Sequence, residues 1–535
     1  MLVSNSDAVG RRPGIAGFAR GIERAAERCV TGSREGLVIG SALVGFTILW
    51  TLFQLVASAS VDVHSDVGDI LLSARDFGIG HRHPPLAAWV FGLWFAVFPR
   101  ADWSVYLLTV TMVATTLAVT WRLLRDHLDA NRALLGIAAL ILVPLFTFRA
   151  STLDENTVTM PFWAAAVLFY LRARRGLRSF DAVLAGAFAS LAFLGKYWAI
   201  YLVAGMAITA LVGAGTRRFW RSPAPYLMAA AAAVVVAPHL YGLANADGTS
   251  LSFVQSGVMG VESVGEAFAK SAYYLLGAAA YVAAPLLLLA MLRPSRAALA
   301  DIASPADADR QQALLLFALP LILPALVNLV LPHRLTPVWT FPNWALLPVV
   351  LYGSPLITID ARAAARAGLL ALAVTLAAVI ASPVLSYLQL RYGDDLARAH
   401  SQQAAQAVER FAGQPVELYG GSEEAVRGLA FYLPAAARRL PGDMTSARNR
   451  AEIGAKGAVI ICLHDDAPCL ADGAALAGAM PRQTDVTLTR TLLGFSGRPA
   501  TYRIIMVPAE RAGAALAPGG RPLVTPHLWS AALLP

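Results

Sequence analysis

The sequence predicts a mainly α-helical, polytopic membrane protein with a small C-terminal α/β domain, and three observations support this class. Of the 535 residues, 57% are hydrophobic and only 14% are charged, which is too apolar for an ordinary soluble protein. Apolar runs of roughly 20 residues, long enough to cross a bilayer as helices, recur from Gly36 to Ser386. The C-terminal part instead mixes charges, turns and short strand-like runs. We therefore expect a basic arm at 1–35, a membrane domain at 36–389 and a soluble domain at 390–535.

The arm at 1–35 is basic and precedes the first apolar run. It is too long and too interrupted for a cleaved signal peptide. We expect it to stay on the cytoplasmic side, where Lys and Arg are enriched, with 15–30 lying on the inner leaflet as an amphipathic helix. Its arginines are Arg11, Arg12, Arg20, Arg24, Arg28 and Arg34.

The apolar runs predict about eleven membrane spans. They lie at 36–58, 103–122, 132–149, 157–172, 181–195, 197–214, 224–243, 271–292, 311–332, 336–353 and 367–388. With the N-terminus inside, each of the inner loops contains at least two Arg, as the positive-inside rule requires. These inner loops are 122–132, 172–178, 216–221, 293–310 and 360–366. An odd number of crossings places the C-terminal domain on the outer side.

One apolar run, LAAWVFGLWFAVF at 86–98, does not fit this alternation. It is short for a span, and counting it as one would move the arginine-rich loop at 172–178 to the outside. We therefore expect a juxtamembrane or re-entrant helix on the outer side. The prolines just before it suit a helix start, where a missing N–H costs no hydrogen bond.

Polar residues collect on the outer side of this topology. The first outer loop, at 61–85, contains four Asp, three His and two Arg beside apolar runs. Ionisable groups near membrane depth are expensive to place there and indicate a functional site. The outer polar residues are Asp66, Asp69, Asp154, Glu155, Lys196, His239, Asn245, His333 and Arg334.

Three motifs in this order resemble a known family. They are HPPLAAW at 83–89, LDENTVTMPFWAAAVLFYL at 153–171 and LGKYWAIYL at 194–202. The chain is similar to the polyprenyl-phosphate-sugar-dependent glycosyltransferases of the protein O-mannosyltransferase superfamily, which includes glycosyltransferase family 39 and the lipid A aminoarabinose transferases. The similarity covers 36–260, and more loosely the later spans, including HRLTPVWTFPNW at 333–344. It implies the GT-C fold, with catalysis on the non-cytoplasmic side.

The resemblance assigns roles residue by residue. The family's outer loop usually begins with Asp-Glu, and Asp66 stands 17 residues before His83 as that pattern requires, with Val67 in the place of the Glu. The second family acid falls on Asp154. Lys196 matches a basic residue common in that span. Asp66 and Asp154 are therefore the catalytic candidates.

The chemistry of sugar transfer asks for the same kinds of group. An acceptor hydroxyl must lose a proton while the anomeric C–O bond to phosphate breaks, and a carboxylate can take that proton. In an inverting displacement this base lies opposite the leaving group, a role that we assign to Asp66. Fixed positive charge holds the phosphate. The residues expected to bind substrate are Asp69, Arg82, His83, Glu155, Lys196, Asn245, His333 and Arg334.

Simpler roles compete with these assignments. Asp66 and Asp154 could each be helix caps, because Asp favours such positions. Lys196 could extend to the interface without a ligand. His83 could be a turn residue, and His333, like His239, an ordinary interfacial one. A divalent metal is a further possibility, because oxygen and imidazole ligands occur close together, although their spacing is not diagnostic. These ligands are His64, Asp66, Asp69, His81 and His83.

The C-terminal domain is predicted from strand-like PVELYG, AVIICL, DVTLTRTLL and ATYRIIMVP, with helices at DDLARAHSQQAAQAVERFAG and EEAVRGLAFYL. Cys462 and Cys469 could form a disulfide in an oxidising compartment. The turn between them, His464 to Asp466, could suggest a metal but is better explained as solvated.

The predicted function is transfer of a sugar from a polyprenyl phosphate carrier to a lipid, glycan or protein acceptor, at the periplasmic face of a bacterial inner membrane and with the C-terminal domain in the periplasm. The scattered basic residues give no nucleic-acid module, and the sequence has no GxxxxGK[ST] nucleotide loop. The alternative classes are a lipid or sugar transporter or flippase, and a non-catalytic scaffold with a periplasmic sensor domain. No inverted repeat supports the transporter.

Overall fold

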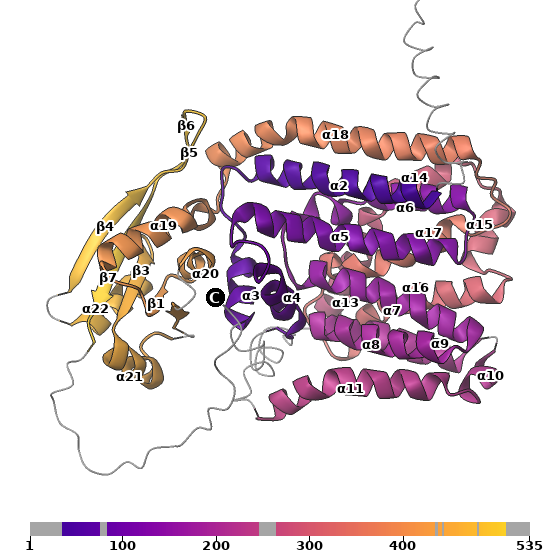
Figure 1. Ribbon diagram of the computed structural model, residues 1–535, viewed down its shortest axis with the longest axis horizontal. Helices are drawn as coiled ribbons and strands as arrows, with labels where there is room; N and C mark the ends of the chain where they lie inside the picture. Colours follow the sequence, from indigo (N-terminus) through magenta and orange to yellow (C-terminus); the bar gives the residue numbers. More distant parts are fainter. Residues whose placement is uncertain are drawn as a thin grey trace, which may run out of the picture. The chain divides into compact units, whose positions relative to one another are not determined.

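The computed structural model describes residues 35–74, 83–213, 215–245, 264–433, 437–440, 443–478 and 481–509. The chain divides into two compact units (Figure 1). We call Met1–Phe53, Gly80–Pro84 and Thr109–Ile380 the helical unit, and Gln54–Ile79, Pro85–Leu108 and Ala381–Pro535 the sheet unit. The sheet unit thus takes in two earlier segments besides the predicted soluble domain. Of the predicted arm only Glu35 is described, and Arg82 and His81 lie outside the described residues.

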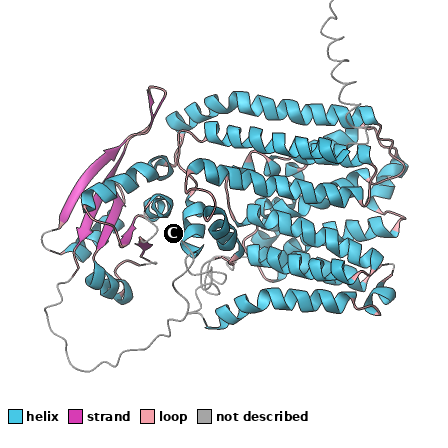
Figure 2. Cartoon of the chain, in the orientation of Figure 1, coloured by secondary structure: helices cyan, strands magenta, loops and turns pink. Residues whose placement is uncertain are grey.

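The helical unit consists of α-helices joined by turns and short 3-10 segments (Figures 1 and 2). Its elements are α2 (Glu35–Ala57), α5 (Asp102–Arg125), α6 (Ala130–Ile141), η1 (Pro144–Phe146), η2 (Arg149–Ser151), α7 (Glu155–Gly176), α8 (Ser179–Gly195), η3 (Tyr197–Ala199), α9 (Ile200–Leu211), α10 (Thr216–Trp220), α11 (Ala224–Asn245), α13 (Val264–Tyr281), α14 (Ala283–Met291), α15 (Arg296–Ala303), α16 (Ala308–Val330), η4 (Pro337–Leu346), α17 (Leu347–Tyr352) and α18 (Ala361–Tyr392). Helices α2, α5 and α18 begin or end in the sheet unit.

Each of the predicted spans coincides with a helix or a pair of helical segments. Among the described residues, five helices are long and apolar enough to cross a membrane: α2, α5, α11, α16 and α18. The pair α13 and α14, bent by 53° at its break, makes a sixth when counted as one span. Helices α6, α8 and α9 are apolar but shorter. The polytopic helical class is confirmed, while the count of about eleven crossings stays a prediction.

Helix α7, whose first turn follows Asp154, is the most buried long helix of the helical unit among the described residues. Its side chains are mostly buried, Trp163 and Tyr170 almost completely. It packs against α8, which in turn packs against α11. Gly186 of α8 permits that second contact, because a Cβ there would lie 2.0 Å from the backbone oxygen of Met228 in α11. Most side chains of α11 remain exposed or half-exposed, as expected for a lipid-facing helix.

Two short helices of the sheet unit come from the first half of the chain. These are α3 (Ser65–Ala74) and α4 (Leu86–Phe95), which pack against each other. Helix α4 is the helix expected at 86–98, and its 10 residues fall short of the roughly 20 that a crossing needs. Helix α3 also packs on α20 of the C-terminal part.

The C-terminal part has the predicted α/β class (Figure 2). Its elements are α19 (Leu396–Ala412), β1 (Leu418–Gly421), α20 (Glu423–Tyr432), β2 (Arg438–Arg439), α21 (Ala447–Lys456), β3 (Ala458–Leu463), α22 (Ala467–Ala477), β4 (Arg482–Leu488), β5 (Thr491–Leu492), β6 (Phe495–Ser496) and β7 (Ala500–Val507). The five-stranded sheet has the order β2-β1-β3-β7-β4. Strands β1, β2 and β3 are parallel, whereas β7 runs antiparallel to both β3 and β4. Strands β5 and β6 form a separate two-stranded ribbon.

The central strand β3 is apolar throughout because both of its faces are covered. Val459 and Ile461 belong to the hydrophobic cluster with α19 and α20, whereas Ile460 and Cys462 belong to the cluster with α21 and α22. Alternate residues of a strand point to opposite faces, so the run AVIICL fills two cores.

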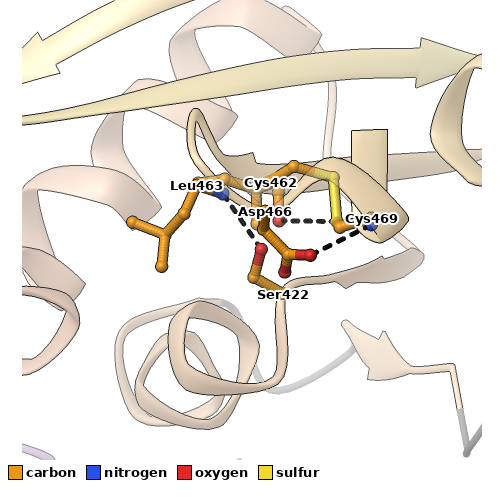
Figure 3. Close-up of a disulfide and its surroundings, with 6 residues drawn as sticks. Ser422, Cys462, Leu463, Asp466 and Cys469 are labelled. Atoms are coloured by element: carbon orange, nitrogen blue, oxygen red, sulfur yellow. Dashed lines mark hydrogen bonds between the residues drawn. A yellow bond between two sulfur atoms is a disulfide. The ribbon is translucent and has the colours of Figure 1, made fainter. Parts of the chain in front are cut away.

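A disulfide joins the end of β3 to α22 (Figure 3). Cys462 and Cys469 have Cα atoms 5.7 Å apart, and both are buried. Between them, Asp466 caps α22 by accepting a hydrogen bond from the N–H of Cys469 at 3.1 Å. The predicted pairing is present, and Asp466 has a structural role in the turn.

Candidate active site

The first turn of α7 contains Asp154, a site candidate that is also the helix cap. Asp154 Oδ1 accepts hydrogen bonds from the backbone N–H of Thr157 at 2.9 Å and from its hydroxyl at 3.1 Å. Asp154 Oδ2 accepts a hydrogen bond from Asn156 Nδ2 at 2.8 Å. The carboxylate is only 9% exposed. These contacts hold Asp154 rigidly at the start of α7.

Lys196 lies at the break between α8 and η3, where the backbone is extended. Its ammonium donates a hydrogen bond to Asn156 Oδ1 at 2.6 Å and lies 4.8 Å from the centre of the Trp339 ring. An aromatic face attracts a cation, most strongly where water is excluded. Asn156 therefore joins Lys196 to Asp154, and the two predicted charges belong to one network.

Aromatic side chains surround the Lys196 segment. The Trp198 ring lies 4.8 Å from the rings of both Tyr201 and Trp339, and 6.4 Å from that of His333. His333 Nδ1 lies 2.9 Å from the carbonyl oxygen of Leu331, which can only accept, so Nδ1 holds the proton. Nε2 of the same ring lies 3.4 Å from the Tyr201 hydroxyl.

Glu155 and His83 approach each other next to Asp154. His83 Nε2 lies 3.7 Å from Glu155 Oε1, and Glu155 is only 7% exposed. The structure thus brings four predicted site residues, His83, Asp154, Glu155 and Lys196, to the region around the start of α7.

The remaining predicted site residues in the described part of the helical unit are Asn245, His333 and Arg334. Asn245, the last residue of α11, is exposed and donates to the carbonyl oxygen of Tyr241 at 2.7 Å. Arg334 is exposed, whereas its neighbour His333 is buried. The roles proposed for these residues stay predictions.

An open apolar groove of about 550 Å³ runs along α8, α9 and α11. Phe193 and Ile200 line it, and these residues lie on either side of Lys196 in the sequence. Within this segment, the Tyr197 hydroxyl lies 2.9 Å from Nε2 of the buried His239. The groove therefore follows the helices that lead to the Lys196 break.

The sheet unit contains the second predicted cluster, on α3. Arg427 of α20 donates from Nη2 to Asp66 Oδ1 at 2.6 Å and from Nε to Asp69 Oδ2 at 2.9 Å. Arg439 of β2 donates to Asp69 Oδ1 at 3.2 Å. His64 Nδ1 lies 3.3 Å from Asp66 Oδ2. We call Asp66, Asp69, Arg427 and Arg439 the α3–α20 clamp.

Burial and charge oppose each other in this clamp. The pKa of Asp69 is raised overall, because the effect of burial is larger than the opposing effect of the nearby Arg427 and Arg439 charges. Burial lowers the pKa of Arg427, but Asp69 and Asp66 outweigh that effect and its pKa is raised overall. The clamp therefore favours a charged guanidinium between two carboxyl groups.

The described side chains named above as possible metal ligands are divided between these contacts. His64 faces Asp66, Asp69 faces two arginines and His83 faces Glu155. Among the described residues, no three His, Cys, Asp or Glu side chains group as metal ligands would.

Sequence reasoning missed several residues of these networks. The aromatic residues after Lys196 and around Trp339 were visible within LGKYWAIYL and HRLTPVWTFPNW, and Asn156 follows the acidic pair within LDEN. Nothing in the sequence indicated Arg427, because it lies 361 positions from Asp66.

Comparisons with known proteins support the class of the protein. Residues 82–241 match the family described as dolichyl-phosphate-mannose-protein mannosyltransferase. No curated protein matches the chain. The crystal structure of ArnT from Cupriavidus metallidurans in the apo state aligns over 89% of this chain and 100% of that one, with a TM-score of 0.54 and 16% identity. The same enzyme bound to undecaprenyl phosphate aligns over 90% and 100%, with a TM-score of 0.57 and 14% identity. The predicted resemblance and fold class are confirmed.

Proposed function

We propose that this protein is a membrane glycosyltransferase that moves a sugar from a polyprenyl phosphate carrier to a lipid, glycan or protein acceptor at the periplasmic face. The observation behind the proposal is an ammonium, Lys196, held by Asn156 and Trp339 at the break between helices that line an apolar groove. A polyprenyl phosphate has the matching parts: an anionic head and a long hydrocarbon tail. Lys196 binds the phosphate and the groove takes the tail.

The reaction needs one proton acceptor and one stabiliser of negative charge. The acceptor oxygen forms a bond to the anomeric carbon as the bond from that carbon to the phosphate oxygen breaks. The hydroxyl proton passes to a carboxylate, for which Asp66 is the candidate by family resemblance. The electron pair leaves with the phosphate, whose added charge Lys196 stabilises. Attack opposite the leaving group inverts the anomeric carbon.

Similarity to known proteins supports a polyprenyl donor. ArnT from Cupriavidus metallidurans, whose fold this chain shares, was crystallised with undecaprenyl phosphate, and the matched family is described by a dolichyl phosphate sugar. Both carriers are polyprenyl phosphates.

The disulfide supports the periplasmic face. Disulfides persist in oxidising compartments such as the bacterial periplasm and are rare in the cytosol. The Cys462–Cys469 bond belongs to the sheet unit, which contains Asp66 as well. We therefore propose that this unit is periplasmic and that the arm at 1–35 is cytoplasmic.

A turnover assay on purified protein tests the function. Detergent-solubilised protein is given polyprenyl phosphate sugars and membrane extracts containing acceptors, and mass spectrometry follows the released polyprenyl phosphate and the glycosylated product. We expect sugar-dependent release by the wild type and none by Asp66→Asn. A wild type that moves the lipid across vesicles but releases no carrier phosphate would instead indicate a transporter.

Lys196→Met tests the donor-binding assignment separately. A hydrogen bond to a charged group is worth about 1.5–3 kcal/mol, so KM for the donor should rise roughly 10- to 100-fold. Lys270→Met is the matched control, because Lys270 is a partly exposed lysine of α13 that pairs with Glu266. An unchanged donor KM in Lys196→Met would refute this role.

A further inference from the structure

Asp66 is held by a cation from a distant part of the chain. Arg427 Nη2 donates to Asp66 Oδ1 at 2.6 Å, while Nε of the same guanidinium donates to Asp69 Oδ2 at 2.9 Å. The two acids lie three positions apart on α3, so they project from the same face of the helix. One guanidinium therefore fixes both carboxyl groups at once.

The backbone allows this contact only because of Gly68. A Cβ at Gly68 would lie 2.2 Å from the carbonyl oxygen of Arg427 and 3.1 Å from Cβ of Ala430. Helix α20 therefore packs closely on α3 at Gly68, which lies between Asp66 and Asp69 in the sequence. The clamp is a packed interface with a defined geometry, unlike a loose pair of surface charges.

The second arginine of the clamp, Arg439, contacts acids other than Asp66. It binds Asp69 Oδ1 at 3.2 Å and also Glu423, so its contacts stabilise the α3–α20 interface. Arg427 shares the contact to Asp69 and adds the one to Asp66. Arg427 and Arg439 thus have the same charge and lie in the same cluster, but Arg427 also hydrogen-bonds to Asp66, the proposed base. Substituting each in turn therefore distinguishes a role at Asp66 from a role in the interface.

We propose that Arg427 is a positioning residue for catalysis, which orients Asp66 and keeps it ionised for proton transfer. This inference rests on the proposed function, in which Asp66 accepts the proton of the acceptor hydroxyl. Arg427 engages Oδ1, and the proton goes to Oδ2, the oxygen on the side of His64. The C-terminal α/β fold is then part of the catalytic machinery, because it supplies the cation that orients the base.

The charges that face Asp66 give the expected pH dependence. Among the described residues, His64 and Arg427 contact Asp66 directly. Asp69 on α3, Glu423 on α20 and Arg439 on β2 belong to the same network of ion pairs. A carboxylate that loses its neighbouring cation binds a proton more readily. Removing the Arg427 charge should therefore move the acidic limb of the pH–rate profile to higher pH.

Steady-state kinetics of Arg427→Gln, with Arg439→Gln as the matched control, test the proposal. We expect Arg427→Gln to lower kcat roughly 10- to 100-fold, in line with the loss of a charged hydrogen bond, with the donor KM unchanged and the acidic limb moved to higher pH. Arg439→Gln should change kcat by less than about 3-fold, since it leaves the contact to Asp66 intact.

Three results would overturn the proposal. They are wild-type kcat in Arg427→Gln, equal losses in the two arginine variants, and failure of both Arg427→Gln and Arg427→Lys to yield folded protein while Arg439→Gln folds. The last result would make the clamp purely structural. If the proposed glycosyltransferase function is wrong, the wild type itself releases no carrier phosphate from any donor. That outcome is distinct from the three results above, which concern the role of Arg427 alone.

Discussion

Buried Asp62 should make the stability of the sheet unit depend on pH. Its side chain is 0% exposed and accepts hydrogen bonds from the N–H of Gln402 at 2.7 Å and from Arg490 at 2.8 Å. Burial raises the pKa of Asp62 from 3.8 to about 6, against the opposing effects of the Gln402 N–H and of Arg490. The folded state therefore binds a proton more tightly than the unfolded state.

The sign and size of the effect follow from this shift. The stabilisation is fully present below pH 3.8 and is lost as the pH rises through about 6. A shift of about two units at 1.36 kcal/mol each corresponds to about 3 kcal/mol in full. About 2 kcal/mol of this is lost between pH 4 and pH 7, because pH 4 already lies above 3.8. Burial raises the pKa of Asp69 as well, which adds a dependence of the same sign. Asp62→Asn should remove the pH dependence of stability that Asp62 causes and leave the part that Asp69 causes.

Hydrogen exchange on the full-length protein in micelles measures this difference. Protection of the β3 and β7 amides, corrected for the intrinsic pH dependence of exchange, gives the local free energy of opening. Asp465→Asn is the control, because Asp465 is an exposed turn carboxylate. Equal pH dependence in wild type and Asp62→Asn, or wild-type stability that rises from pH 4 to pH 7, would refute the reasoning.

Three further predictions concern the α3–α20 contact, the disulfide and the apolar groove. Gly68→Ala should destabilise the α3–α20 contact by about 1–3 kcal/mol, seen as faster hydrogen exchange in α3, since the added Cβ meets a backbone oxygen at 2.2 Å; unchanged protection would contradict the close approach. Replacing Cys462 and Cys469 by Ser should lower the stability of the sheet by about 2–3 kcal/mol, as a cross-link between residues seven positions apart predicts; identical denaturant midpoints would exclude this contribution. Ala207→Trp, in the groove, should raise the donor KM several-fold, whereas Ala279→Trp, at an exposed position of α13, should not; equal effects would show that the groove does not take the tail.

The sequence alone determined the class of the protein and most of its elements. Composition and the length of apolar runs are properties of consecutive residues, so they predicted the polytopic helical part directly. The strand AVIICL could be assigned for the same reason, because its apolar run reflects local burial on both faces. The sequence motifs also contain the candidate residues His83, Asp154 and Lys196, so these could be named without a structure. Helix α4 was predicted from its short apolar run after two prolines.

Only the tertiary structure decided which polar side chains meet. Lys196 reaches Asn156 across 40 positions, and Arg427 reaches Asp66 across 361. Such pairs depend on how helices pack, for example on the close approach at Gly68, and no periodicity in the sequence encodes that contact. The sequence therefore identified Asp66 as a candidate base, while packing against α20 supplied the cation that we propose orients it.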